Sequence, residues 1–184
     1  VFLMRSTGPT HHQALWAVFD GLIRDTLNQI LGSSVNDQHW AQAQLPVAMG
    51  GLGLRGAADH SAGAFISSVH ASESLKEGLL PHGNVPIDIN SAMALLREKV
   101  DELAPEQIPE MTQKMISLEI DKNLKIGLVH SLSDKRDKAR MASLGLPHAG
   151  DWLNVIPSPI LGLHVRPQEF RYSVLYRLGA PIYP

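Results

Sequence analysis

The sequence has 184 residues, of which 44% are hydrophobic and 18% are charged. This composition supplies enough apolar side chains for one domain or two small ones and excludes a wholly disordered chain. The 16 Lys and Arg against 18 Asp and Glu give a net charge of -2, which argues against a stand-alone protein that attracts nucleic acid through a global positive field.

The first predicted element is a helix over residues 11–31, with Thr10 as its N-cap and Gly32 as its C-terminal stop. Its apolar residues recur at three- and four-residue spacing, which places them on one face of a helix. These residues are Leu15, Phe19, Leu22, Ile23, Leu27, Ile30 and Leu31. A short helix with Asp37 as its cap is expected next, and Pro46 ends it.

Three glycines within four residues follow, at Gly50, Gly51 and Gly53. Because glycine permits positive φ and a close approach of the backbone, they predict a tight and partly buried turn. Small residues alternate with apolar ones over residues 57–80, which indicates one or two closely packed helices. Residues 81–86 are then expected to form a loop.

The second half of the chain also has helical periodicity. Asp88 or Asn90 should cap a helix that runs to about Leu103. Thr112 opens a longer amphipathic stretch, and residues 134–140 are expected to continue it as a solvated extension. Its apolar positions recur every four residues, at Ile116, Ile120, Leu124, Leu128 and Leu132.

A last helix is predicted over Pro167–Leu178, with an inner face of Phe170, Val174, Leu175 and Leu178. We find no run of strand patterns and no internal repeat in the sequence. The fold class that follows is all-α, an irregular helical bundle with Gly/Pro-rich connections. We expect two segments, residues 1–80 and residues 81–184.

The residue patterns of common active sites are missing from the sequence. The turn at Gly50–Gly53 lacks the spacing and the following Lys-Ser/Thr of a phosphate-binding loop. No two aspartates are adjacent, so the paired carboxylates of two-metal polymerases are absent. Without cysteine there are no thiolate nucleophiles, disulfides or Cys-based zinc sites. We therefore predict no catalytic residues, no metal site and no cofactor.

The nine histidines do not form a helical zinc pattern, because no two are four residues apart. Asp59 and His60 are interpreted as a structural or capping pair, and His130 as a residue at the edge of the core. The three tryptophans are far apart in the sequence and are interpreted as core residues rather than as a base-stacking platform. They are Trp16, Trp40 and Trp152.

One local cluster of basic residues stands out, and two interpretations of it stay open. It consists of Lys135, Arg136, Lys138 and Arg140, interrupted by Asp137. The cluster is either a solvated helix face or a contact with a phosphate backbone.

No apolar run approaches the ~20 residues that span a bilayer, and the four apolar residues at the start are shorter than a signal-peptide core. We expect an intracellular protein, cytoplasmic or nuclear, without membrane contact, cut from a longer chain.

Two segments carry a family resemblance. The first reads Leu45-Pro46-Val47-Ala48-Met49-Gly50-Gly51-Leu52-Gly53-Leu54-Arg55, followed by Ala57-Ala58-Asp59-His60-Ser61-Ala62. The second contains Trp152-Leu153-Asn154-Val155-Ile156-Pro157-Ser158, Leu161-Gly162-Leu163-His164 and Leu175-Tyr176-Arg177-Leu178-Gly179. Both resemble the region downstream of the polymerase palm in reverse transcriptases of non-LTR (LINE-like) retrotransposons. Residues 2–7 resemble the end of a thumb helix in that family, and Phe19-Asp20 and residues 40–43 fit the same region.

The resemblance implies a non-catalytic fragment of an RNA-directed DNA polymerase with a right-hand fold. Residues 1–80 would be thumb-like and residues 81–184 would follow the thumb. The catalytic aspartates would lie in an upstream palm, a further partner of this chain, and a Cys/His segment would follow residue 181. In the family the thumb packs against the template–primer duplex, so the implied ligand is an RNA–DNA or RNA duplex.

The residues expected to contact the phosphate backbone are Arg5, Arg24 and Arg55, together with Lys135, Arg136, Lys138 and Arg140. Two other functions stay open. One is a helical protein–protein interaction domain of retroelement ancestry that does not bind nucleic acid. The other is a self-contained hydrolase built on His and Asp residues.

Overall fold

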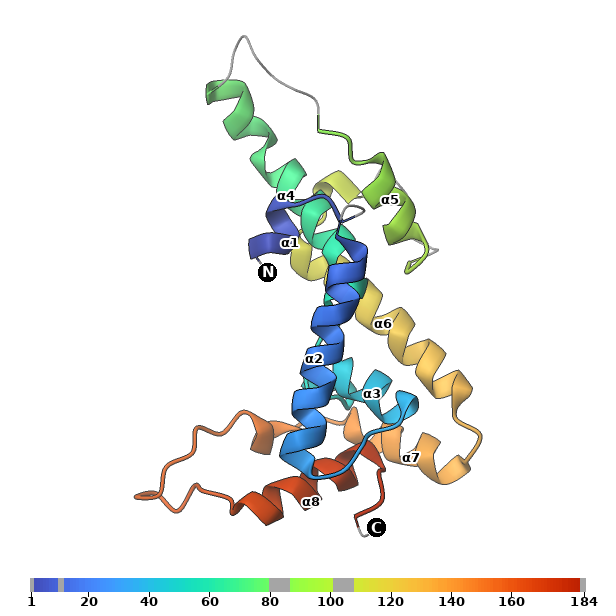
Figure 1. The fold of residues 1–184 in the computed structure, drawn as a ribbon, viewed down its shortest axis with the longest axis vertical. Coiled ribbons are helices and arrows are strands. Elements are labelled where there is room, and N and C mark those ends of the chain that lie inside the picture. The colour runs from blue at the N-terminus through green and yellow to red at the C-terminus, as the bar shows by residue number, and fades with distance from the viewer. Residues whose placement is uncertain (1, 10–11, 80–86, 101–107, 183–184) are drawn as a thin grey trace. The chain divides into compact units, whose positions relative to one another are not determined.

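The computed structural model describes residues 2–9, 12–79, 87–100 and 108–182. In these ranges the regular structure is helical and no strand is present, which confirms the all-α prediction (Figure 1). The α-helices are α1 (Phe2–Ser6), α2 (Gln13–Leu31), α3 (Asp37–Gln44), α4 (Ala57–Leu79), α5 (Asn90–Arg97), α6 (Gln113–Ser131), α7 (Lys135–Leu144) and α8 (Pro167–Leu178). Short 3-10 helices are η2 (Val47–Met49), η3 (Ile108–Glu110) and η4 (Asp151–Leu153).

The chain forms two compact units, and each unit is built from two separate stretches of sequence. Unit 1 consists of Val1–Asp20 and Gly56–Asn123. Unit 2 consists of Gly21–Arg55 and Leu124–Pro184. The predicted division between residues 80 and 81 falls within the second stretch of unit 1, at residues outside those that the structure describes.

Most predicted helices are present, but three of their boundaries differ. The N-cap of α3 is Asn36, whose Oδ1 accepts the His39 N–H, and not the predicted Asp37. The helix beginning at Asn90 ends at Arg97, earlier than the predicted Leu103. The predicted extension of the long helix through residues 134–140 is wrong, because α6 ends at Ser131 and α7 begins separately at Lys135. Asp134 makes the break: its backbone is extended and its carboxylate accepts the Arg136 N–H, as an N-cap does.

The helix predicted over residues 11–31 is present as α2, and Gly32 ends it with a φ of 70°. The predicted cap Thr10 lies outside the described residues. The predicted inner face is wrong for the first half of α2. Leu27 and Leu31 are buried, whereas Leu15, Phe19 and Leu22 are exposed.

In unit 1, the long helix α4 packs against α1 and α5. Its small and apolar residues are buried, among them Ala62, Ala64 and Ile66. The range predicted to hold one or two helices is thus a single helix of 23 residues. An aspartate that is distant in sequence caps it: the Asp20 carboxylate accepts the N–H groups of Ala57, at 2.7 Å, and Ala58, at 3.0 Å.

Replacing Asp20 by alanine is expected to lower the free energy of unfolding by about 1–2 kcal/mol. Two N–H groups at the start of α4 lose their acceptor, and the negative charge at the positive end of the helix dipole is lost with it. The measurement is urea unfolding followed by helical circular dichroism. Asp25→Ala, an exposed position on the same helix α2, is the control. Equal stability of the two variants would contradict the capping role.

Unit 2 contains two apolar clusters. The first joins α2, α3 and α8 through Leu27, Leu31, Val35, Ala43, Val174, Leu175, Leu178 and Ala180. The second joins the end of α6 to α7 and to the turn after α3 through Leu45, Leu128, Leu132 and Met141. Of the inner face predicted for α8, Val174, Leu175 and Leu178 are buried, but Phe170 is exposed.

Candidate nucleic-acid interface and buried arginine network

The two units carry opposite net charges. Unit 2 has ten Lys and Arg against six Asp and Glu, a net charge of +4. Unit 1 has six Lys and Arg against twelve Asp and Glu, a net charge of -6. The value of -2 for the whole chain conceals this separation. A net negative charge therefore opposes a nucleic-acid contact by unit 1 but not by unit 2.

Three residues of the predicted basic cluster are exposed at the start of α7: Lys135, Arg136 and Lys138. The N-terminal end of a helix is the positive end of its dipole, where cations are unfavourable for helix stability. Asp134 and Asp137 offset part of this repulsion. The Asp134 carboxylate already accepts the Arg136 N–H, so a phosphate group would be bound by the three exposed cations rather than by the helix start.

Arg140, the fourth residue of the cluster, is mostly buried instead of exposed. Its side chain is only 17% exposed. The guanidinium Nη1 donates to Gln42 Oε1, at 2.9 Å, and to the Arg177 carbonyl oxygen, while Nε lies 3.2 Å from Asp137 Oδ1. Burial, and after it the positive charge of Arg140, lower the pKa of His39 on α3. The N–H donors of the Arg140 guanidinium are used inside unit 2, so we leave Arg140 out of the proposed interface.

The other three predicted arginines are divided between the units. Arg5 belongs to unit 1, where its Nε donates to Gln113 Oε1 at 2.7 Å. Arg24 on α2 donates to Asp37 Oδ1 at the start of α3, at 2.8 Å, and to the Val35 carbonyl oxygen in the loop before it, at 2.7 Å. Arg55 is exposed after the glycine turn. Arg5 therefore belongs to a different unit from the other six candidates.

The centre of unit 2 is a buried arginine, which the sequence patterns did not single out. Arg177 on α8 is 2% exposed. Its guanidinium donates to the carbonyl oxygens of Val47 at 2.7 Å, Gly51 at 3.0 Å and Ala149 at 3.0 Å. Burial lowers the pKa of Arg177 from its ordinary value. The side chain still carries its charge, since arginine does not lose its proton in proteins.

Gln42 completes this arginine network, which we define as Gln42, Gly51, Arg140 and Arg177. The Gln42 side chain is buried, and its Nε2 donates to the carbonyl oxygens of Gly50 and Arg177, both at 2.9 Å. The network thus joins residues 45–55 to residues 175–179, two stretches that carry the family resemblance. Within unit 2 these stretches have a shared structural role.

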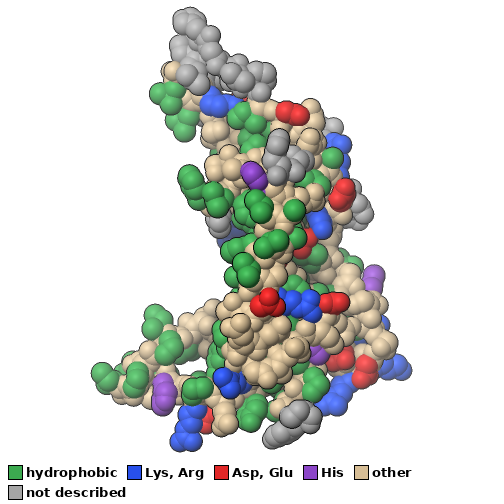
Figure 2. Space-filling model, in the orientation of Figure 1, with side chains coloured by type: hydrophobic (Ala, Val, Ile, Leu, Met, Phe, Trp, Pro, Cys, Tyr) green, Lys and Arg blue, Asp and Glu red, His purple; other side chains and the backbone are tan. Residues whose placement is uncertain are grey.

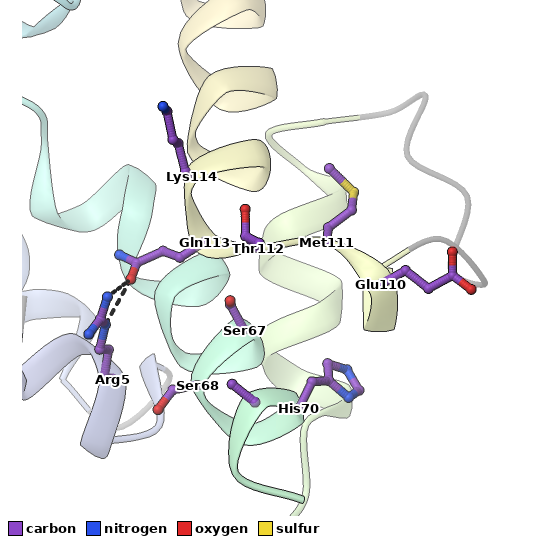
Figure 3. Close-up of a pocket in the computed structure, with 10 residues that line it drawn as sticks. Arg5, Ser67, Ser68, His70, Glu110, Met111, Thr112, Gln113 and Lys114 are labelled. Atoms are coloured by element: carbon purple, nitrogen blue, oxygen red, sulfur yellow. Dashed lines mark hydrogen bonds between the residues drawn. The ribbon is translucent and has the colours of Figure 1, made fainter.

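The described part of unit 1 contains a cavity of about 550 Å³ between α1, α4 and the start of α6 (Figure 3). Arg5 lies at its edge with its guanidinium turned to Gln113, as the dashed lines show. The acidic Glu110 and the basic Lys114 both line the cavity, so its charge is mixed. The remaining lining residues are Ser67, Ser68, His70, Ala71, Met111 and Thr112. We see no concentration of one charge that would select an ionic ligand.

A histidine and an aspartate are buried together elsewhere in unit 1. His60 Nε2 lies 3.3 Å from Asp121 Oδ1, and both side chains are buried. Neighbouring Asp59 turns instead to Lys99, whose Nζ is 2.7 Å from Asp59 Oδ1. In the ranges that the structure describes, no three His, Asp or Glu side chains are grouped to hold a metal ion. The hydrolase alternative gains no support from this geometry.

The tryptophans were predicted to be core residues, and Trp152 departs from this. It is exposed and contacts Phe170 edge to face, with ring centroids 6.3 Å apart and an interplanar angle of 71°. Trp16 and Trp40 are partly buried. The prediction is therefore wrong for Trp152, which packs beside the start of α8 instead of entering an apolar cluster.

None of the helices in the described ranges combines the length and the hydropathy that a membrane span requires. Comparison of this chain with protein-family models, with curated proteins and with solved structures found no match.

Proposed function

We propose that this chain is a non-catalytic segment of a reverse transcriptase-like protein of non-LTR retrotransposon type, which contacts the phosphate backbone of a template–primer duplex through unit 2. The observation that carries the proposal is the net charge of +4 on unit 2, with Lys135, Arg136 and Lys138 exposed at the start of α7. Cations that neutralise phosphates release counterions from the duplex, and this release drives binding.

The arginine network supports the ancestry in this proposal. Residues 45–55 and 175–179 resemble the same family region and are far apart in the sequence. They meet through the hydrogen bonds of Arg177 and Gln42. A shared structural role gives a physical reason why the two stretches would be inherited together.

Replacing Lys135, Arg136 and Lys138 together by alanine is expected to flatten the dependence of log affinity on log salt by about 2–3 units. Each lost phosphate contact removes about 0.7–0.9 from that slope, depending on the nucleic acid. The measurement is fluorescence anisotropy of a labelled RNA–DNA hybrid across a salt series, with single-stranded RNA alongside.

The matched control removes the same charges from unit 1, by replacing Arg97, Lys114 and Lys122 with alanine. All three are exposed, and the set again holds one Arg and two Lys. We expect its salt slope to equal that of the unchanged protein. Equal slopes for both triple variants and the unchanged protein would contradict a phosphate contact at α7.

One observation favours a second function, that of a protein–protein interaction domain. The exposed apolar residues Leu15, Val18 and Phe19, in the part of α2 that belongs to unit 1, would suit a helical protein–protein interaction domain that lost nucleic-acid binding. That reading predicts no affinity for the hybrid at low salt in a protein whose helical circular dichroism is intact. The proposed nucleic-acid contact predicts affinity under the same conditions.

A further inference from the structure

Unit 2 carries a projecting arm, which we define as residues 155–165. Figure 1 shows this orange segment reaching away from the helices of unit 2 before it returns to α8. Two hydrogen bonds close it: the Ser158 N–H donates to the Leu163 carbonyl oxygen at 2.8 Å, and the Leu163 N–H donates to the Ser158 carbonyl oxygen at 2.9 Å. Gly162, with a φ of 68°, allows the turn between them. The arm therefore has a defined tip.

The tip of the arm presents aliphatic side chains to solvent. Ile160 is 96% exposed and Leu161 is 72% exposed. Figure 2 shows hydrophobic side chains along the part of unit 2 that corresponds to the arm. Single exposed aliphatic residues are common on proteins, but a contiguous group marks a binding surface. The exposed group consists of Val155, Ile156, Ile160, Leu161, Leu163 and Val165.

The charges on and beside the arm favour a negatively charged partner. No acidic residue occurs between Asp151 and Glu169, whereas His164 and Arg166 are exposed where the arm joins α8. The arm also belongs to the unit with a net charge of +4. The arm itself carries no acidic residue, and an apolar tip beside the basic Arg166 complements a duplex, which has phosphates outside and stacked bases inside. Proteins that bend nucleic acid use Ile, Leu and Pro side chains as wedges against base steps.

We propose that the arm places Ile160 and Leu161 as an apolar wedge against the bases of the duplex, in its minor groove. An A-form duplex has a wide, shallow minor groove, which gives a narrow arm access to base edges. This inference rests on the proposed function, because the cations of α7 hold the same duplex. The wedge adds contacts that do not depend on counterion release.

A lipid surface is the main competing partner for an apolar arm. Segments that sit at a membrane interface are enriched in Trp and Tyr. The arm contains no aromatic residue, and the nearby Trp152 packs against Phe170. The composition thus favours the duplex, and a lipid surface becomes an outcome of the test.

The test replaces Ile160 and Leu161 together by serine in the full chain. The probe is an RNA–DNA hybrid that carries 2-aminopurine, whose fluorescence rises when the base is unstacked. We expect the unchanged protein to raise this fluorescence. The double variant should lose that rise and bind about tenfold more weakly, with the salt slope unchanged. Both positions are exposed, so the fold is expected to be retained.

Leu146→Ser is the matched control, because Leu146 is 63% exposed in unit 2 and lies outside the arm. It should bind and unstack the probe as the unchanged protein does. Equal affinity and equal fluorescence in the double variant would overturn the wedge. The salt slope assigned to α7 would survive that result, so the two failures are distinguishable. A protein that binds no hybrid at low salt would overturn both proposals.

Two further outcomes would also overturn the wedge by giving the arm another partner. In one, the double variant loses binding to phosphatidylcholine–phosphatidylserine vesicles while its affinity for the hybrid is unchanged. In the other, sedimentation shows a dimer of the unchanged protein that the double variant does not form, again with unchanged affinity for the hybrid.

Discussion

Replacing Arg177 by alanine is expected to lower the free energy of unfolding by about 3–5 kcal/mol. The substitution leaves the carbonyl oxygens of Gly51 and Ala149 without their arginine donor, while the Val47 carbonyl keeps only the Gly50 N–H. Each buried group that loses its hydrogen bond costs about 1–3 kcal/mol. The glycine turn, the segment before η4 and α8 lose their common contact at the same time.

Arg177→Lys should be nearly as damaging as Arg177→Ala, because one ammonium group cannot reproduce the three directions of the guanidinium. Arg166→Ala, an exposed arginine beside the same helix, is the control and should change stability by less than about 0.5 kcal/mol. Urea unfolding followed by circular dichroism measures all three. A loss below about 1 kcal/mol in Arg177→Ala would show that the network does not stabilise unit 2.

Gly51→Ala is the second large effect, with an expected loss of about 3 kcal/mol or more. A Cβ atom at this position would overlap the Leu45 carbonyl oxygen and lie 2.5 Å from the Gln42 carbonyl oxygen. Both are backbone atoms, which cannot move aside as a flexible side chain can. The turn would have to open, and opening it would displace the Gly51 carbonyl that accepts from Arg177.

Gly127→Ala is the control, and we expect it to raise the free energy of unfolding instead of lowering it. Gly127 lies inside α6, and a Cβ there meets nothing within 4 Å. Alanine should stabilise that helix by about 0.5–1 kcal/mol, because it restricts the unfolded chain and favours helix. Thermal unfolding of the two variants would show shifts in opposite directions. Similar shifts of the same sign would contradict the close approach at Gly51.

Helix positions could be predicted well from the sequence, because caps and stop signals act locally. Gly32 and the Pro167–Leu178 helix are examples. The break at Asp134 was missed because the apolar spacing on either side suits one continuous helix, and only the cap geometry separates α6 from α7. Burial was harder to predict. Leu15 follows the same periodicity as Leu31, but only Leu31 meets a neighbouring apolar cluster.

The candidate interface could be predicted only in part. The basic cluster is visible in the sequence, but the inward direction of Arg140 depends on Gln42, which precedes it by 98 residues. Arg177 and Gly51 are 126 residues apart, so no local sequence pattern predicts their hydrogen bond. The charge of unit 2 was hidden for the same reason, since the unit combines two distant stretches.

The most direct test of the proposed function is the affinity of the unchanged protein for an RNA–DNA hybrid at several salt concentrations. A duplex contact through unit 2 predicts binding at low salt that weakens steeply as salt rises, with a slope that depends on Lys135, Arg136 and Lys138. No binding at low salt, by a protein whose helical circular dichroism confirms that it is folded, would contradict it.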